Sequence, residues 1–324
     1  MTIMINTEFE SHDCPWCQNS EYKIVVSGPD LLAGLPGRFQ FVKCSNCGLL
    51  RQEPRLSWKD LLRYYPPNYV SHQPLPVEEH NILTRMTRRY GLQKRVRFIK
   101  KYVPSGNWLD VGCGSGLILS EAKYANTWSL EGLEPVTKQA LSTSRKLDIP
   151  VHNSAFEEFD APNSSYDLIT MFDVLEHLLN PIEGIKKVSR LLKANGYFIF
   201  AIPNLNSYDR KLFKSYWVGY DLPRHLFLYP HDLLEKMLSS FDLQIISSRC
   251  VAGSHGALKM NLMFYNQNFQ SPIIEFLVHN KIGDAILKGI DLIPLFISDL
   301  LKQSTDIFFV AKKVNRIQSA AENN

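Results

Sequence analysis

The chain has 324 residues, of which 45% are apolar and 21% charged, and its formal net charge is +4. This is the composition of an ordinary soluble protein with enough apolar material for one large domain and a smaller one, and the net charge is too small to indicate nucleic-acid binding by itself. No run of about 18 apolar residues suggests a membrane span. Residues 1–10 lack the basic and apolar segments of a signal peptide, so we expect a cytoplasmic protein.

The first 50 residues carry four of the six cysteines. They form two Cys-x-x-Cys pairs, made by Cys14, Cys17, Cys44 and Cys47. Residues 22–27 and 38–43, between the pairs, are predicted to be two short strands. In a cytosolic chain, thiols at this spacing indicate the four ligands of a structural Zn²⁺ rather than disulfides. We therefore predict a zinc ribbon over residues 1–56, too small to be stable without its metal.

A proline-rich stretch, residues 57–80, is interpreted as a linker. It leads into a helix expected near residues 78–102, where apolar residues recur every three or four positions. Residues 80–108 contain no acidic side chain but eight basic ones: Arg85, Arg88, Arg89, Lys94, Arg95, Arg97, Lys100 and Lys101. We interpret them as a solvated helix face, with a contact surface for phosphate or an anionic membrane as the alternative.

From residue 107 onward, strands alternate with helices, which is the pattern of a parallel sheet flanked by helices. The expected strands are residues 108–111, 129–133, 151–156, 166–171, 197–202, 243–249 and 306–311. Asn180 and Pro181 mark the start of a helix that Asn195 and Gly196 should end. The predicted fold class is therefore α/β, a Rossmann-like sheet with helices on both faces.

The predicted core occupies residues 81–251, the last core strand lies within residues 304–314, and residues 315–324 are expected to form a disordered tail. Residues 252–303, between the last two strands, are too long for a passive loop and should form helices of their own. We expect these helices to pack on the domain or on a second subunit of a homodimer. The alternatives are a lid, or a surface that docks on a membrane or covers a lipid-linked acceptor.

The first core strand ends in a glycine-rich turn. Its candidate ligand-binding residues are Asp110, Gly112, Cys113, Gly114 and Gly116. Glycines let the backbone turn sharply and approach a ligand, and the start of the next helix offers free N–H groups. The Gly-x-Gly-x-Gly spacing differs from the Gly-x-Gly-x-x-Gly of dinucleotide sites, and the Asp110 carboxylate would repel a pyrophosphate but suits a cationic amino-acid group.

Glu134 ends the second core strand, where a carboxylate can accept hydrogen bonds from both hydroxyls of a ribose. By itself it could be an ordinary surface acid. Beside Asp110 and the glycine turn, the ligand role is favoured.

Residues 107–203 resemble the class I S-adenosylmethionine-dependent methyltransferases in four segments: LDVGCGSG, LEGLEP, SYDLITMFDVLEHLLNP and RLLKANGYFIFAIPN. The resemblance implies that S-adenosylmethionine is the methyl donor. It places Asp110, Gly112 and Gly114 at the methionine half of the donor and Glu134 at its ribose. The adenine side would be formed by Ala155 and Phe156, with Phe172 and Asp173 completing the cofactor set, although many relatives carry an acid where this chain has Ser154.

Asp173, Glu176 and His177 follow the fourth core strand. They resemble the acid-x-x-Glu-His segment with which the ubiquinone-biosynthesis O-methyltransferases hold a divalent cation, so a second cation such as Mg²⁺ is a hypothesis for this position. The alternative, which the shorter side chain of Asp173 favours, is that these residues pair or cap locally.

A loop after the fifth strand gathers side chains with catalytic chemistry: Trp217, Asp221, Arg224 and His225. It resembles the substrate-side loop of small-molecule methyltransferases of this type. His225 is the best candidate for a general base because the pKa of an imidazole lies near neutrality. A histidine held structurally by loop carbonyls is the equal alternative.

The sequence therefore predicts S-adenosylmethionine-dependent methyl transfer, on the oxygen of a small molecule or of a glycan- or lipid-linked intermediate. One alternative is an RNA methyltransferase that grips phosphates with the zinc ribbon and the basic helix 85–101. However, Met171, Phe172 and Asp173 stand where base-amine methyltransferases show Asn/Asp-Pro-Pro-aromatic. The other is a non-catalytic zinc-bearing binding protein, which the intact turn and Glu134 disfavour.

Overall fold

The structure is a computed structural model that describes residues 8–65, 75–78, 82–250 and 255–314. It divides into two compact units. The first comprises Met1–Pro66, Ile202–Leu233 and Arg249–Phe308, and the second comprises Pro67–Ala201, Leu234–Ser248 and Phe309–Asn324. Residues 66–74, 79 and 80 of the proline-rich linker and the whole predicted tail lie outside the described residues.

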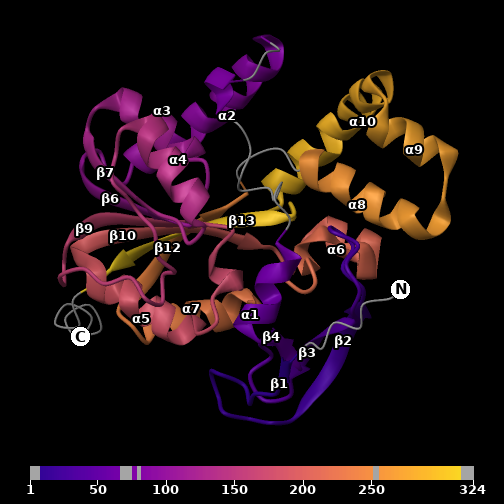
Figure 1. The fold of residues 1–324 in the computed structure, drawn as a ribbon, viewed down its shortest axis with the longest axis horizontal. Helices are drawn as coiled ribbons and strands as arrows, with labels where there is room; N and C mark the ends of the chain where they lie inside the picture. Colours follow the sequence, from indigo (N-terminus) through magenta and orange to yellow (C-terminus); the bar gives the residue numbers. More distant parts are fainter. Residues whose placement is uncertain (1–7, 66–74, 79–81, 251–254, 315–324) are drawn as a thin grey trace. The chain divides into compact units, whose positions relative to one another are not determined.

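A seven-stranded sheet forms the centre of the second unit (Figure 1). Its strands are β6 (Gly106–Val111), β7 (Trp128–Leu133), β8 (Val151–His152), β9 (Tyr166–Phe172), β10 (Leu192–Pro203), β12 (Leu243–Arg249) and β13 (Asp306–Lys313). They lie in the order β12-β13-β10-β9-β6-β7-β8. The pairs β10–β9, β9–β6, β6–β7 and β7–β8 are parallel. The predicted Rossmann-like α/β class is confirmed.

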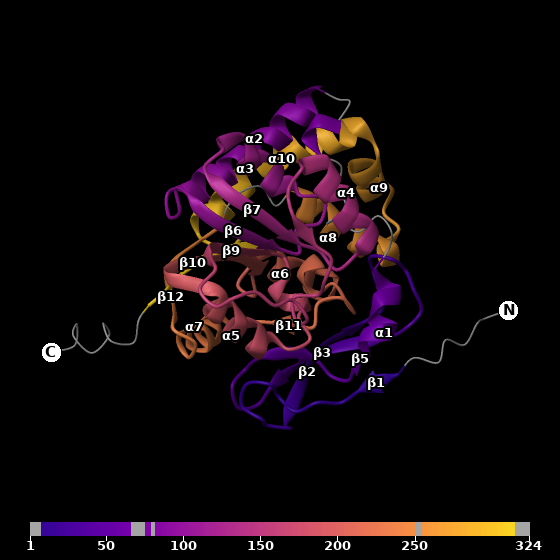
Figure 2. The same cartoon turned by 60° about the vertical axis from the view of Figure 1, so that its left-hand side comes forward.

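Helices cover both faces of this sheet (Figures 1 and 2). On one face lie α2 (Ile82–Lys100), α3 (Leu117–Ala125) and α4 (Thr137–Leu147), and on the other lie α5 (Pro181–Leu191) and α7 (His231–Ser239). Trp108 of β6 is fully buried between strand and helix side chains, and its Nε1 donates to Thr170 Oγ1 at 2.8 Å. The strands are apolar almost throughout because helices exclude water from both faces.

Two boundaries of the second unit differ from the sequence-based expectation. Helix α5 begins at Pro181 as predicted but ends at Leu191, so Asn195 and Gly196 lie within β10. Asn195 has φ 63°, and the register of β10 against β9 shifts between Leu192 and Tyr197. The turn-forming residues therefore make a bulge in a strand rather than the end of a helix.

The third core strand is also shorter than predicted. Strand β8 ends at His152 because the chain then turns toward the end of β7. The Nδ2 of Asn153 donates to the carbonyls of Glu134 and Pro135, at 3.1 and 3.0 Å.

The first unit is built on a second sheet with the order β11-β4-β3-β2. Its strands are β2 (Tyr22–Gly28), β3 (Phe39–Cys44), β4 (Leu50–Gln52) and β11 (Phe227–Leu228), and β1 (Phe9–Glu10) pairs with β5 (Arg55–Leu56). Phe227 and Leu228 pair with Arg51 and Leu50 in antiparallel register. A strand from the loop after β10 thus completes the sheet of the N-terminal residues.

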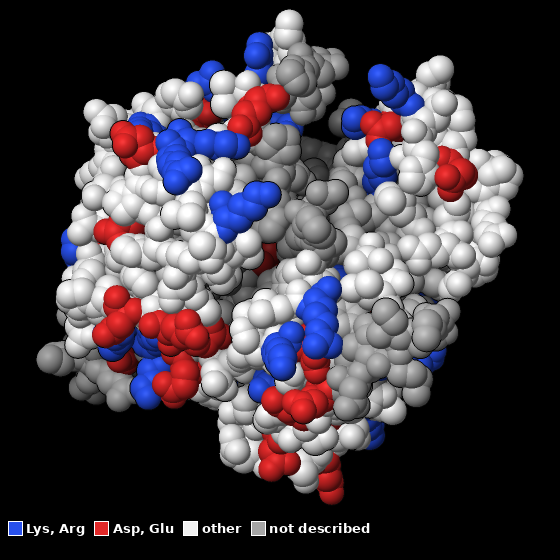
Figure 3. Space-filling view, in the orientation of Figure 1, with Lys and Arg blue, Asp and Glu red and all other residues white. Residues whose placement is uncertain are grey.

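The remaining helices of the first unit are α1 (Trp58–Leu61), α6 (Tyr208–Phe213), α8 (His255–Phe269), α9 (Pro272–His279) and α10 (Lys281–Leu300). The last three occupy the segment between β12 and β13. Ile282, Ile286, Ile290 and Ile297 of α10 are all exposed, and their spacing puts them on one face of the helix. On the side that Figure 3 shows, the surface over α10 carries both basic and acidic side chains, next to large uncharged areas. No described helix is both long and apolar enough to cross a bilayer.

Candidate functional site

The turn after β6 requires glycine at more than one position. Gly112, Gly114 and Gly116 have φ values of 68°, 52° and 75°, in the left-handed region that disfavours other residues. A Cβ on Gly112 would lie 2.5 Å from Val174 Cγ2, and one on Gly116 would lie 2.4 Å from Leu147 Cδ1. The backbone of this turn is therefore close-packed, and most of its N–H groups donate within the protein. Those of Gly112 and Cys113 donate to the Leu133 carbonyl, at 2.8 and 3.0 Å, and that of Gly116 to the Cys113 carbonyl at 2.8 Å. The N–H groups that a ligand can use are those at the start of the helix that follows.

Asp110, just before the turn, is buried, and its Oδ1 accepts from Thr170 Oγ1 at 2.5 Å. The pKa of Asp110 is raised to about 7, chiefly by burial and in part by the charge of Glu134, against the lowering by the Thr170 hydrogen bond. A buried carboxyl of this kind gains from a cationic group placed beside it, because the cation favours its ionised form. The site suits an ammonium and opposes a phosphate.

Glu134 is held at the end of β7 by two backbone amides. Its Oε2 accepts from the Gly114 N–H and its Oε1 from the Val136 N–H, both at 3.0 Å. A carboxylate has about four acceptor positions, so these bonds orient Glu134 without saturating it. The thiol of Cys113, by contrast, packs against β7. A Cβ on Gly132 of that strand would lie 2.7 Å from Cys113 Sγ. Cys113 therefore contributes its backbone to the turn, not its side chain.

Ser115 is a residue of this turn that the sequence analysis did not select. Its side chain is buried, and its Oγ has no hydrogen-bond partner among the described residues. It lies between Gly114 and Gly116, immediately before α3, where helix N–H groups are also unpaired. The only sequence signal was its position between Gly114 and Gly116. A buried hydroxyl there can donate to a ligand carboxylate.

The predicted adenine side has one buried and two half-buried residues. The ring of Phe156 is buried and contacts Lys187 Nζ, 5.4 Å from the ring centre, whereas Ser154 and Ala155 are half-buried. The Oγ of Ser154 donates to the Ala155 carbonyl at 3.0 Å. Phe172, also half-buried, packs against the core beside β6. Contact of these residues with a cofactor stays a prediction.

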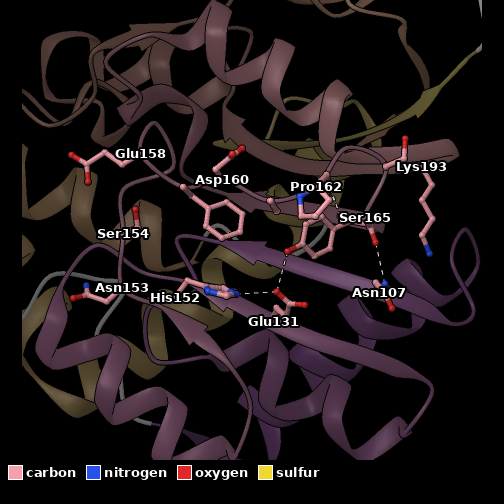
Figure 4. A pocket seen from close by; sticks show the side chains of 14 residues that line it. Asn107, Glu131, His152, Asn153, Ser154, Glu158, Asp160, Pro162, Ser165 and Lys193 are labelled. Atoms are coloured by element: carbon pink, nitrogen blue, oxygen red, sulfur yellow. Dashed lines mark hydrogen bonds and ion pairs between the residues drawn. The ribbon is translucent and has the colours of Figure 1, made fainter.

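A cavity in the second unit has a volume of about 880 Å³ (Figure 4). Asn107, Tyr166 and Lys193 line it at the amino-terminal ends of β6, β9 and β10. Inside it, Glu131 accepts from Tyr166 Oη at 3.0 Å and contacts His152 Nε2 at 2.9 Å. It contains neither the glycine turn nor Glu134. Ligands of open α/β sheets bind at the carboxyl ends of the strands, so this cavity is not the predicted cofactor site.

Asp173, Glu176 and His177 follow β9. Asp173 has φ 58°, a strained value for a residue other than glycine. Glu176 is fully buried and His177 half-buried. Within the described residues, Asp173 belongs to no group of three or more potential metal-ligand side chains whose ligand atoms lie within 4.8 Å of one another. The second-cation hypothesis for Asp173, Glu176 and His177 stays a prediction.

His225 in the first unit is oriented by a loop carbonyl. Its Nδ1 lies 2.9 Å from the Gly219 carbonyl oxygen, which can only accept, so Nδ1 carries the proton. In the neutral imidazole Nε2 is then the basic nitrogen. Gln52 Nε2 donates to the carbonyls of His225 and Pro223, at 2.5 and 2.7 Å, and holds the backbone of this loop. The geometry shows the structural hold, and the role of His225 as a base stays a prediction.

Arg224 is fully buried within the first unit. Its Nε donates to both carboxylate oxygens of Asp221, at 3.0 and 2.9 Å. Its Nη2 donates to Asp30 at 2.8 Å and its Nη1 to the Tyr64 carbonyl at 2.7 Å. A guanidinium enclosed in this way has no surface for a substrate. This differs from the catalytic role expected for Arg224, which instead ties the loop to the N-terminal residues.

The four N-terminal cysteines converge. All their Sγ atoms lie within 4.8 Å of one another, with Cys14–Cys47 and Cys17–Cys44 at 3.5 Å. Burial alone raises the pKa of Cys17, but hydrogen bonds from the Asn19 amide, the Asn46 side chain and neighbouring thiols outweigh it and lower that pKa to about 6. Four thiolates at Zn–S distances of about 2.3 Å have sulfurs about 3.8 Å apart in a tetrahedron, so the cluster fits a structural zinc ion.

The sheet order and the glycine turn between two acids define a Rossmann-like fold of the class I methyltransferase type. Residues 83–248, just over half of the chain, match the methyltransferase domain family. The chain belongs to this family.

Two curated relatives are ubiquinone biosynthesis O-methyltransferases. The protein of Photobacterium profundum is 37% identical over 106 residues, which cover 31% of this chain and 44% of that protein. The protein of Aliivibrio fischeri strain MJ11 is 32% identical over 155 residues, 46% of this chain and 58% of that protein. The chain thus spans about half the length of the curated relatives it matches. A solved complex of the Haloferax volcanii Trm112 methyltransferase activator and a methyltransferase gives a TM-score of 0.49 at 14% identity, covering 72% of this chain and 93% of that one.

Proposed function

We propose that this protein transfers a methyl group from S-adenosylmethionine to an oxygen of a small molecule or of a glycan- or lipid-linked biosynthetic intermediate. The arrangement of Asp110, the glycine turn and Glu134 carries the proposal, because it offers one carboxylate to an ammonium and another to ribose hydroxyls. The matched O-methyltransferases support oxygen as the methylated atom.

S-adenosylmethionine, when bound, supplies an electrophilic methyl group on a sulfonium. The protein's task is then to bind and orient. Asp110 compensates the charge of the donor's ammonium, the Ser115 hydroxyl and the N–H groups at the start of α3 donate to its carboxylate, and Glu134 accepts from its ribose. Positioning of this kind accounts for most of the acceleration in a direct displacement.

A hydroxyl acceptor must lose its proton as its oxygen takes the methyl group. We assign this proton to Nε2 of His225, since the Gly219 carbonyl fixes the proton of the same ring on Nδ1. We assign positioning roles to Trp217 and Asp221, which belong to the same loop as His225 and help to fix its conformation. A divalent cation such as Mg²⁺ at Asp173, Glu176 and His177 stays a hypothesis of the sequence analysis.

The test of donor binding is a calorimetric titration with S-adenosylhomocysteine at pH 8, above the raised pKa of Asp110. We expect Glu134→Ala to weaken binding by about 1.5–3 kcal/mol, the usual value of a hydrogen bond to a charged group. Glu158→Ala is the control, because Glu158 is exposed. Equal affinity of wild type and Glu134→Ala would remove Glu134 from the ribose.

We also propose that the Cys14, Cys17, Cys44 and Cys47 cluster holds one structural Zn²⁺. Elemental analysis of the purified chain should give one zinc per chain. In Cys47→Ser that zinc should be lost and the N-terminal residues should unfold, because binding of the metal supplies their folding free energy. Cys250→Ser, which leaves the cluster intact, should keep the zinc. Wild-type protein that is folded over residues 8–56 without metal would contradict the proposal.

A small-molecule acceptor is the partner we propose, with the apolar face of α10 available for a second copy of the chain or for peripheral membrane contact. RNA is not favoured. On α2, Arg89 pairs with Glu121 at 3.3 Å and lies over the Tyr124 ring, so part of the basic helix is engaged within its own unit. On the face that Figure 3 shows, Lys and Arg side chains lie beside acidic ones and form no continuous basic surface.

A further inference from the structure

The first unit contains a cavity of about 220 Å³ that neither the donor site nor the zinc cluster uses. Three segments line it: the end of β2 with the turn after it, residues 215–222, and α8. Its principal side chains are Arg38, Tyr216, Trp217, Tyr220, Phe264 and Asn268. Ligand sites for drug-sized molecules are usually about 300–1,000 Å³, so this one suits a single ring with short substituents.

Contacts between these segments hold the cavity in shape. Asn268 Nδ2 donates to Tyr216 Oη at 2.6 Å, and Gln267 Nε2 donates to the Leu31 carbonyl at 2.8 Å. The rings of Trp217 and Tyr220 meet edge to face with centroids 5.1 Å apart. Aromatic walls fixed in this way form a preorganised slot for a ring.

The indole of Trp217 packs on the backbone of Gly219. A Cβ on Gly219 would lie 2.2 Å from Trp217 Cζ2, so the ring occupies the space that glycine leaves open. Trp217 is only 1% exposed, and its Nε1 is closed to solvent. The indole therefore contributes its ring to the wall of the cavity, not its N–H.

The charges around the cavity favour an anion. Arg38 is exposed and makes no ion pair within the described part of the chain. The nearby carboxylate of Asp221 is compensated, because the Arg224 guanidinium contacts both of its oxygens. The uncompensated charge that lines the cavity is therefore the positive one of Arg38.

We propose that this cavity binds a one-ring aromatic carboxylic acid. The ring lies against the wall that Tyr216, Trp217, Tyr220 and Phe264 form, and the carboxylate pairs with Arg38. The proposal does not rest on methyl transfer, because none of these side chains belongs to the donor site.

The test is a fluorine NMR titration of the full-length, zinc-loaded protein with 4-fluorobenzoate, and in parallel with the neutral 4-fluorobenzamide. We expect Arg38→Gln to weaken 4-fluorobenzoate about tenfold and to leave 4-fluorobenzamide unchanged, as the loss of one charge-assisted contact requires. Trp217→Phe, which replaces the indole by a smaller ring and so alters the aromatic wall, should weaken both probes about three- to tenfold. Lys59→Gln removes an exposed charge that does not line the cavity, and it should bind like wild type.

Absence of binding of 4-fluorobenzoate to wild type would overturn the proposal. So would equal weakening by Arg38→Gln and Lys59→Gln, which would show a non-specific charge effect. If Trp217→Phe does not fold, the Arg38→Gln comparison still decides, since Arg38 is exposed. Titration of the same samples with S-adenosylhomocysteine tests donor binding separately, so a failure of 4-fluorobenzoate binding can be told apart from a failure of the proposed function.

Discussion

Replacing Arg224 by Met is expected to destabilise the first unit by about 3–5 kcal/mol, the usual cost of removing one partner from a buried ion pair. The substitution leaves the carboxylates of Asp30 and Asp221 without their cation. Asp30 keeps hydrogen bonds from the amides of Leu32 and Ala33, which reduce this cost but do not remove it. Urea unfolding followed by fluorescence gives the free energy of unfolding.

Arg63→Met is the matched control, because Arg63 pairs with Asp60 at 2.9 Å but is 48% exposed. An exposed pair of this kind contributes about 0–1 kcal/mol. Adding Asp221→Asn to Arg224→Met should recover part of the loss. If Arg224→Met is as stable as Arg63→Met, the buried network does not hold the loop to the N-terminal residues.

Replacing His225 by Ala is expected to lower the turnover number by about 10²-fold or more, while the affinity for S-adenosylhomocysteine stays unchanged. General-base catalysis contributes about 10²–10⁴-fold. The Gly219 carbonyl holds the proton of the His225 ring on Nδ1, which leaves Nε2 as the basic nitrogen that the substitution removes. The measurement uses the acceptor identified by a screen with labelled donor.

The pH dependence of turnover separates a base from a positioning residue. Wild type should lose activity as pH falls and Nε2 of His225 becomes protonated, and His225→Ala should lack this limb of the profile. His152→Ala, at a histidine in the open cavity of the second unit, should keep it. A His225→Ala enzyme with turnover within about twofold of wild type would exclude the base role.

The parts of the structure that the sequence predicted well depend on neighbouring residues. The glycine turn is specified by Gly112, Gly114 and Gly116 themselves, since each has a positive φ. Likewise, in each Cys-x-x-Cys pair only two residues separate the cysteines, so the local turn alone places two thiols together. The start of α5 at Pro181 follows from the proline, which needs no N–H donor partner at the first helical position.

The parts that the sequence could not predict depend on residues far apart in the chain. Strand β11 pairs with β4 across more than 170 positions, and two residues carry no periodicity from which a strand can be inferred. Arg224 was assigned a catalytic role because the sequence does not show its structural partners. These partners, Asp30 and the Tyr64 carbonyl, lie more than 150 positions away in the N-terminal residues. For the same reason the N-terminal strands do not form a sheet of their own, and their unit includes residues 202–233.

The central claim is that the protein binds S-adenosylmethionine at the turn between Asp110 and Glu134. Hydrogen exchange measured by mass spectrometry, with and without S-adenosylhomocysteine, tests it most directly. We expect slower exchange in peptides that contain residues 111–117 and 133–137, whose amides surround the turn, and no such slowing with NAD. Unchanged exchange in both peptides under saturating S-adenosylhomocysteine, or equal protection by NAD, would contradict the claim.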